Sequence, residues 1–192
     1  MRRGFFLLPV FVLSINLLAF NQMEYAKKQD DIVVIKTDYG TIQIAMFKDK
    51  APRNVQNIIK LVKEGFYNGS TFHRVIPGFV IQGGDPNTKD NDPSNDGYGG
   101  PGYYIEDEFS KDLHHLPGTI AMAKAKPDQN GSQFYICLDT LKYLDGKYTI
   151  VGQLIEGMDV VFKISQVKTD KKDRPIKDVI MKKVYLREKE RK

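Results

Sequence analysis

The alternation of apolar and polar residues divides most of this chain into short strands. Runs of β-branched and aromatic residues, bounded by glycine, proline and aspartate, predict strands at 32–36, 41–47, 70–76, 79–82, 119–123, 133–138, 149–154 and 179–186. Asp38, Tyr39 and Gly40 stand between the first two runs and are typical of a hairpin turn. Many short strands with few helices indicate a β-barrel or a β-sandwich.

Two segments repeat their apolar residues at helical spacing instead. Within residues 52–63 a proline stands near the start, and Val55, Ile58 and Val62 recur on one face. Residues 157–164 predict a short second helix. Between strands, residues 83–104 are rich in glycine, aspartate, asparagine and proline, and a stretch of this length is often a functional loop.

The N-terminus has the pattern of a secretory signal. Arg2 and Arg3 precede a mostly apolar run over residues 5–20, which is short for a permanent membrane span. Cleavage after Ala19 is one outcome, and a retained single-helix anchor is the alternative. No linker long enough to separate two domains follows. We therefore predict a signal peptide or N-terminal anchor at 1–25, one domain at 30–187 and a charged tail at 188–192.

Composition narrows the function classes. The 192 residues are 41% apolar and 28% charged, as in ordinary soluble proteins. Cys137 is the one cysteine, so the chain forms no internal disulfide and no cysteine-rich zinc site. The net charge of +5 is mild and dispersed, which argues against a nucleic-acid partner. His114 and His115 are adjacent and indicate a surface turn rather than a metal site.

The densest chemistry lies in residues 71–85. Strand alternation puts Phe72, Arg74 and Ile76 on one face, and Val80 and Gln82 share a side after the Pro-Gly bend. From spacing alone, Arg74 is more readily explained as a surface ion pair than as a functional group.

Three motifs together change that interpretation. Residues 71–85, the Gly-Ser-Gln-Phe at 131–134 and the Tyr-Leu-Asp-Gly-Lys at 143–147 resemble the cyclophilin family of peptidyl-prolyl cis-trans isomerases, with matching order and spacing from 32 to 186. The resemblance implies a mainly β fold, a closed eight-stranded antiparallel barrel capped by two α-helices. It also implies a substrate groove on the outside of the barrel.

The same resemblance assigns the candidate site. Arg74 would be the catalytic arginine and Gln82 its polar neighbour, with Gln133 beside the groove helping to hold the arginine. The positions expected to bind substrate are Phe79, Val80, Ala123, Lys124, Ala125, Gln133, Tyr135, Tyr143, Leu144 and Tyr148. No metal and no cofactor are expected, because no covalent bond is made or broken.

The chemistry explains why an arginine suits this position. Amide resonance imposes a rotation barrier of roughly 18–20 kcal/mol, and X–Pro bonds exchange isomers over tens to hundreds of seconds. In the twisted transition state the nitrogen becomes pyramidal and gains a lone pair, which a guanidinium N–H can bond. Arginine stays charged and presents a rigid head with several donors.

Five positions depart from the commonest family pattern. Val80 replaces a methionine, and Tyr135 adds a hydroxyl that must find a partner or water. Tyr143 stands where tryptophan is common, which puts tight cyclosporin binding in doubt. Tyr148 replaces a histidine, a change associated with bacterial-type members. Lys124 replaces an asparagine and is expected to bring a charge to the groove.

The leading hypothesis is an exported, monomeric prolyl isomerase of the periplasm or the secreted space. Its partners would be proline-containing segments of unfolded or newly exported proteins, with no nucleic acid and with membrane contact only through an uncleaved N-terminal segment. The alternative is a chaperone module that holds peptides in the same groove without turnover.

Overall fold

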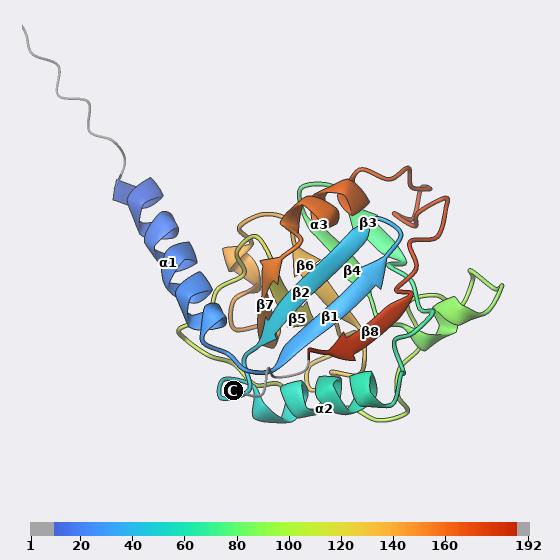
Figure 1. Cartoon of the computed structure of the whole chain (residues 1–192), viewed down its shortest axis with the longest axis horizontal. Coiled ribbons are helices and arrows are strands. Elements are labelled where there is room, and N and C mark those ends of the chain that lie inside the picture. The colour runs from blue at the N-terminus through green and yellow to red at the C-terminus, as the bar shows by residue number, and fades with distance from the viewer. Residues whose placement is uncertain (1–9, 188–192) are drawn as a thin grey trace, which may run out of the picture.

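The structure, a computed structural model, describes residues 10–187, with side chains from Leu17 onward. Residues 1–9, part of the predicted N-terminal segment, and residues 188–192, the predicted tail, lie outside the described residues. Eight strands form one antiparallel sheet in the order β3-β4-β6-β5-β7-β2-β1-β8 (Figure 1). Their bounds are β1 (Ile32–Thr37), β2 (Gly40–Met46), β3 (Arg74–Ile76), β4 (Val80–Gly83), β5 (Thr119–Met122), β6 (Phe134–Cys137), β7 (Ile150–Glu156) and β8 (Lys183–Leu186).

The sheet is an open, curled half-barrel, so the expectation of a closed barrel is wrong. β3 and β8 are its two edges, and among the described residues one isolated bridge, Thr71–Ile180, joins the segments that precede them. Within the sheet, the predicted strand 70–76 is reduced to β3. The N–H of Thr71 donates to the side-chain oxygen of Thr88 at 2.9 Å, while the N–H of Phe72 donates to the carbonyl of Val179 at 2.9 Å.

Both predicted helices are present. α2 (Pro52–Lys63) has the predicted bounds and packs against β8, and α3 (Met158–Ser165) packs against β2. α3 starts one residue later than predicted because Gly157 is its N-cap, with φ +93°. A Cβ at Gly157 would approach the carbonyl oxygen of Thr41 to 2.4 Å, so only glycine fits this tight contact. Two short 3-10 helices complete the elements, η1 (Pro86–Lys89) and η2 (Lys142–Leu144).

A third helix, α1 (Val10–Lys27), overlaps the segment predicted to be a signal peptide or a single-helix anchor. It projects from the domain in Figure 1, but its C-terminal turns dock on the sheet. Gln22 is buried and donates to the carbonyl of His114 (3.1 Å), to Thr119 (2.9 Å) and to Gln153 (3.0 Å). The ring of Tyr25 lies 5.0 Å from that of Phe47. The C-terminal turns of α1 therefore pack on the folded domain.

Two large apolar side chains of α1 are uncovered. Leu17 and Phe20 are 60% and 63% exposed. Within residues 10–187, no helix combines the length and the apolar character that crossing a membrane demands.

The strands bury side chains on both faces of the sheet. On β1, Val33 and Ile35 point into the larger core under α2 and α3, whereas Ile32 and Val34 belong to a second cluster on the outer face. The second cluster also holds Ala26 of α1 together with Val80, Ala121, Tyr135, Cys137 and Ile150. It forms the floor of the candidate site, which therefore lies on the outside of the sheet.

Candidate active site

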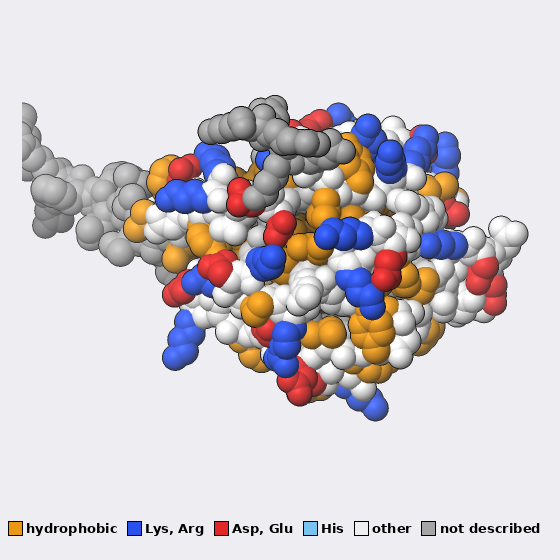
Figure 2. All heavy atoms as spheres, turned by 60° about the horizontal axis from the view of Figure 1, so that its bottom comes forward, with side chains coloured by type: hydrophobic (Ala, Val, Ile, Leu, Met, Phe, Trp, Pro, Cys, Tyr) orange, Lys and Arg blue, Asp and Glu red, His pale blue; other side chains and the backbone are white. Residues whose placement is uncertain are grey.

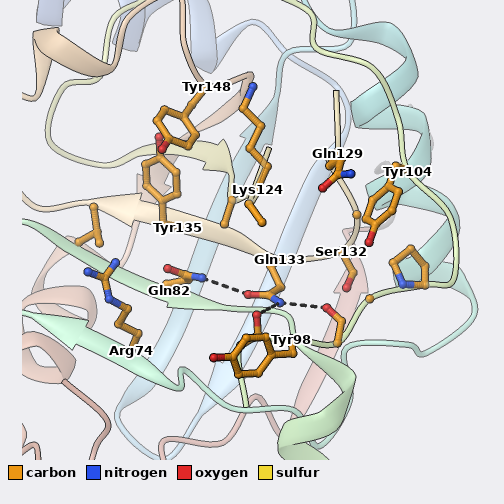
Figure 3. Close-up of a pocket in the computed structure, with 18 of the residues that line it drawn as sticks. Arg74, Gln82, Tyr98, Tyr104, Lys124, Gln129, Ser132, Gln133, Tyr135 and Tyr148 are labelled. Carbon is orange, nitrogen blue, oxygen red and sulfur yellow. Dashed lines mark hydrogen bonds between the residues drawn. The ribbon is translucent and has the colours of Figure 1, made fainter. Parts of the chain in front are cut away.

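A groove of about 710 Å³ crosses the outer face of the sheet (Figure 3). The predicted site residues that line it are Arg74, Phe79, Val80, Gln82, Ala123, Lys124, Ala125, Gln133, Tyr135, Leu144 and Tyr148. Tyr143 is the exception, because η2 turns its side chain outward, where it is 60% exposed and does not line the groove. The structure thus brings together all of the predicted residues but one.

Strand register places the central side chains in one row. Arg74 on β3 pairs with Gln82 on β4, and Gln82 pairs in turn with Tyr135 on β6. Directly opposed residues of antiparallel strands project from the same face, so the three side chains stand side by side. Figure 3 shows Arg74 beside Gln82, with Tyr135 next along the row. A cation, an amide and an aromatic ring therefore face the groove together.

The arginine is held differently from the prediction. Its Nε lies 3.9 Å from the carboxylate of Asp173, and both side chains are nearly half exposed. Gln133 accepts a hydrogen bond from the Nε2 of Gln82 at 3.0 Å and donates to the carbonyls of Gly97 and Gly99 at 2.9 Å. Gln133 therefore braces Gln82 against the long loop, while a surface ion pair accompanies Arg74.

The glycine-rich loop that the sequence marked at 83–104 forms the far wall of the groove. Asp85, fully buried, accepts hydrogen bonds from the backbone N–H groups of Asn87 (2.8 Å), Gly97 and Gly99 (3.1 Å). A Cβ at Gly99 would approach a carboxylate oxygen of Asp85 to 2.1 Å, so this wall needs a glycine there. The loop adds groove residues that no motif assigned: Tyr98, Gly100, Pro101, Gly102, Tyr103 and Tyr104.

The opposite wall is apolar at its surface. The rings of Tyr135 and Tyr148 meet edge to face with centroids 5.9 Å apart, and Phe79 and Leu144 pack on the same cluster. The hydroxyl of Tyr135 lies 3.0 Å from the Nε2 of His115, so the predicted partner for this added hydroxyl is present. Burial raises the pKa of Tyr135, which keeps the hydroxyl protonated.

Lys124 does not bring a free charge to the groove. Its ammonium forms a buried ion pair with Asp107 and lies over the ring of Tyr148, 5.5 Å from the centroid. Burial raises the pKa of Asp107, but hydrogen bonds from Lys124 and from the Asp128 backbone outweigh it, and the net pKa is lowered. The charge is therefore neutralised within the wall.

The adjacent histidines are not a surface turn, contrary to the sequence-based interpretation. His115 is 0% exposed and His114 is partly buried, and both rings bond to Asp145 through their Nδ1 atoms, at 2.8 and 2.7 Å. Only one carboxylate stands with them, and within residues 10–187 no three histidine, cysteine or acidic side chains gather closely enough to hold a metal ion. The pair acts in packing and hydrogen bonding.

Comparisons with known proteins agree with this geometry. Residues 32–186 match the family described as cyclophilin type peptidyl-prolyl cis-trans isomerase/CLD. The fission yeast "Peptidyl-prolyl cis-trans isomerase ppi1" (Schizosaccharomyces pombe) is 43% identical over 159 residues, covering 80% of this chain and 98% of that protein. The human "Peptidyl-prolyl cis-trans isomerase-like 1" is 40% identical over 157 residues, covering 80% of this chain and 90% of that protein.

A solved structure shows the same fold. The crystal structure of a cyclophilin type isomerase of Cryptosporidium parvum, determined in the presence of the dipeptide Ala-Pro, superposes with a TM-score of 0.75 at 35% identity, covering 82% of this chain and 99% of that one. These relatives are eukaryotic, so they lend no support to the bacterial-type placement drawn from Tyr148.

Proposed function

Because this chain belongs to the cyclophilin-type peptidyl-prolyl cis-trans isomerases, and so catalyses rotation about X–Pro bonds in proline-containing peptides, we propose that Arg74 is its catalytic residue. The row formed by Arg74, Gln82 and Tyr135 is the observation that carries the assignment. It puts a permanent cation at the edge of an apolar pocket, where a proline nitrogen would lie.

The mechanism requires only differential binding. In the planar ground state the nitrogen lone pair is delocalised and offers nothing to the guanidinium. As the bond twists, the lone pair localises on nitrogen, and Arg74 donates a hydrogen bond to it. Gln82, braced by Gln133, stands beside the arginine as its polar neighbour. The barrier falls because this bond is stronger in the transition state than in either isomer.

The apolar wall holds the proline ring. Phe79, Val80, Tyr135, Leu144 and Tyr148 surround a space that suits a five-membered ring. Residues 123–125 run along the groove and offer backbone groups to the peptide. The Ala-Pro dipeptide used with the Cryptosporidium parvum relative supports a site of this kind. Fixing the ring while the preceding residue turns converts binding into rotation.

The test is isomer exchange in a short X–Pro peptide. We expect Arg74→Ala to lower kcat/KM by about 100-fold, the usual effect of removing a transition-state donor. Arg187→Ala, an exposed arginine after β8, is the matched control and should stay within twofold of the wild type. A wild-type protein that binds unfolded chains without accelerating exchange would instead support the peptide-holding alternative.

We propose further that the chain is exported and acts as a monomer on newly exported polypeptides in a periplasmic or secreted space. The basic start and apolar run of the sequence support export, as do the uncovered Leu17 and Phe20 on α1. One chain supplies the whole groove, which supports a monomer. Mass analysis of the mature N-terminus should find a start at Phe20, whereas an intact N-terminus would favour the retained anchor.

A further inference from the structure

A hydrogen-bonded cluster lies behind the proline pocket, outside the row that contacts substrate. Asp145 accepts at Oδ1 from the backbone N–H of His115 (2.8 Å) and contacts the ring Nδ1 of the same residue (2.8 Å). The Nε2 of His115 lies 3.0 Å from the hydroxyl of Tyr135, and the two rings are stacked with centroids 6.0 Å apart. A carboxylate, an imidazole and a phenol thus form one chain that ends in the pocket.

The charges fix the direction of each hydrogen bond in this chain. Burial raises the pKa of Asp145, but hydrogen bonds from His114 and His115 outweigh it, so the pKa is lowered and the group is a carboxylate. Burial lowers the pKa of His115 and keeps its ring neutral. A neutral ring that donates from Nδ1 to the carboxylate must accept at Nε2. The hydroxyl of Tyr135 therefore donates to His115, away from the substrate.

This arrangement is unsuited to nucleophilic chemistry but suited to holding a ring. The phenol stays protonated in its buried site, and its proton is already bonded to His115. A ring fixed at both its Cβ and its hydroxyl loses rotational freedom before substrate arrives, which reduces the entropy lost on binding.

We propose that His115 is a positioning residue of the isomerase: held by Asp145, it fixes the ring of Tyr135 in the apolar wall of the proline pocket. The inference rests on the proposed site for the substrate proline. Helix α1 also holds the backbone of the histidine pair, because Gln22 donates to the carbonyl of His114 (3.1 Å) and accepts from its N–H (3.0 Å). The histidine pair is therefore fixed in position from both sides.

Two substitutions separate the two ends of the imidazole. Asparagine has its polar group where Nδ1 of histidine lies, so His115→Asn keeps a partner for Asp145 and removes the acceptor from Tyr135. Glutamine reaches the position of Nε2, so His115→Gln offers the hydroxyl an acceptor again. We expect His115→Asn to raise KM and the Kd for an Ala-Pro dipeptide about fivefold with less change in kcat, and His115→Gln to stay within about twofold.

His114→Leu is the matched control, because the ring of His114 contacts the same carboxylate but not Tyr135. It should leave KM and the dipeptide Kd unchanged. In a Tyr135→Phe background, His115→Asn should have no further effect on either, since the hydroxyl it serves is gone.

The result that overturns the proposal is a His115→Asn protein with wild-type KM and dipeptide affinity, or one whose loss is equally large in the Tyr135→Phe background. If His115→Asn does not fold, His115→Leu in the Tyr135→Phe background removes both the imidazole and the hydroxyl. The KM and dipeptide Kd of this double variant must then match those of Tyr135→Phe alone. Dipeptide binding without turnover in the wild type would contradict the isomerase function and leave the affinity comparison decisive for His115.

Discussion

Besides the loop, the groove is lined by a β3 side that carries Arg74 and a β6 side that carries Tyr135, here its first and second walls, and different forces hold them. On the side of β3, Arg74 has one ion pair, with Asp173, and the two side chains are 41% and 46% exposed. On the side of β6, Tyr135 is backed by His115 and Asp145, and His115 has no exposed surface. The charged side chains of the first wall are solvent-exposed and loosely held, whereas the polar groups behind the second wall are buried and fixed by hydrogen bonds.

This difference matches the tasks of the two walls. The arginine has to follow a nitrogen whose geometry changes during the reaction, so a loosely held head is an advantage. The pocket has to keep one ring still, so a buried network is suitable. Exposed ion pairs contribute little to stability, while an unpartnered buried polar group is costly. Substitutions on the first wall should therefore change turnover, and those on the second should change stability and affinity together.

The largest expected effect is that of Asp145→Asn. The amide cannot accept from both histidine rings and from the His115 backbone as the carboxylate does, so we expect the free energy of unfolding to fall by about 2–3 kcal/mol. Urea unfolding measures the loss. Asp173→Asn, the carboxylate of the other wall, is the control and should lose less than about 0.5 kcal/mol. Equal losses would show that the walls do not differ.

Gln133→Ala should have the next largest effect, on activity. Three hydrogen bonds disappear, one from Gln82 and two to the loop carbonyls of Gly97 and Gly99. We expect kcat/KM for an X–Pro peptide to fall about 20-fold as Gln82 and the loop lose their brace. Gln166→Ala, placed after α3, is the control. A fall in stability without a change in kcat/KM would mean that this brace serves the fold alone.

The buried histidine behind the second wall, His115, should also make the free energy of unfolding depend on pH. The pKa of His115 is lowered below its ordinary 6.5 by burial, so the unfolded state takes up a proton first as the pH falls. Stability should therefore decrease from about pH 6.5 downward, by at most about 1.4 kcal/mol per pH unit for each such histidine. Burial lowers the pKa of His73 in the same direction. Urea unfolding at pH 7 and pH 5.5 should show a shallower decrease in His115→Gln, and an unchanged slope would contradict the assignment.

The smallest expected effect is that of Asp173→Asn on turnover. Losing this exposed carboxylate removes a restraint on Arg74, so kcat/KM should fall by no more than about fivefold. The difference from the wild type should shrink in 0.5 M salt, because salt screens exposed pairs. A larger loss that persists in salt would mean that the arginine is held more firmly than its exposure indicates.

Much of the site could be predicted because it depends on local patterns. Alternation put Arg74 on one face, and the resemblance of three motifs to the cyclophilin family implied the site positions of Gln82, Gln133 and Tyr135. The row that they form needs the pairing of β3 with β4 and of β4 with β6, and the predicted strands were close enough to the observed ones to allow it.

The rest depends on partners that are distant in sequence. Nothing beside His115 indicates that Asp145, thirty positions later, will hold it, so the pair read as a surface turn. The ion pair of Lys124 with Asp107 and the hydrogen bond from Thr71 to Thr88 are equally non-local. For α1 a signal is present, because Gln22 is a polar residue just after an apolar run, but the composition of that run is typical of a secretory signal and predicts no contact with the domain.

The position of Gln22 has a consequence for maturation. Its side-chain amide forms hydrogen bonds with the side chains of Thr119 and Gln153 and with the N–H and the carbonyl of His114. Cleavage after Ala19 would leave Gln22 in place. Cleavage one helical turn further on would remove Gln22 and leave several buried polar groups without hydrogen-bond partners. The fold thus limits how far the proposed leader could be trimmed.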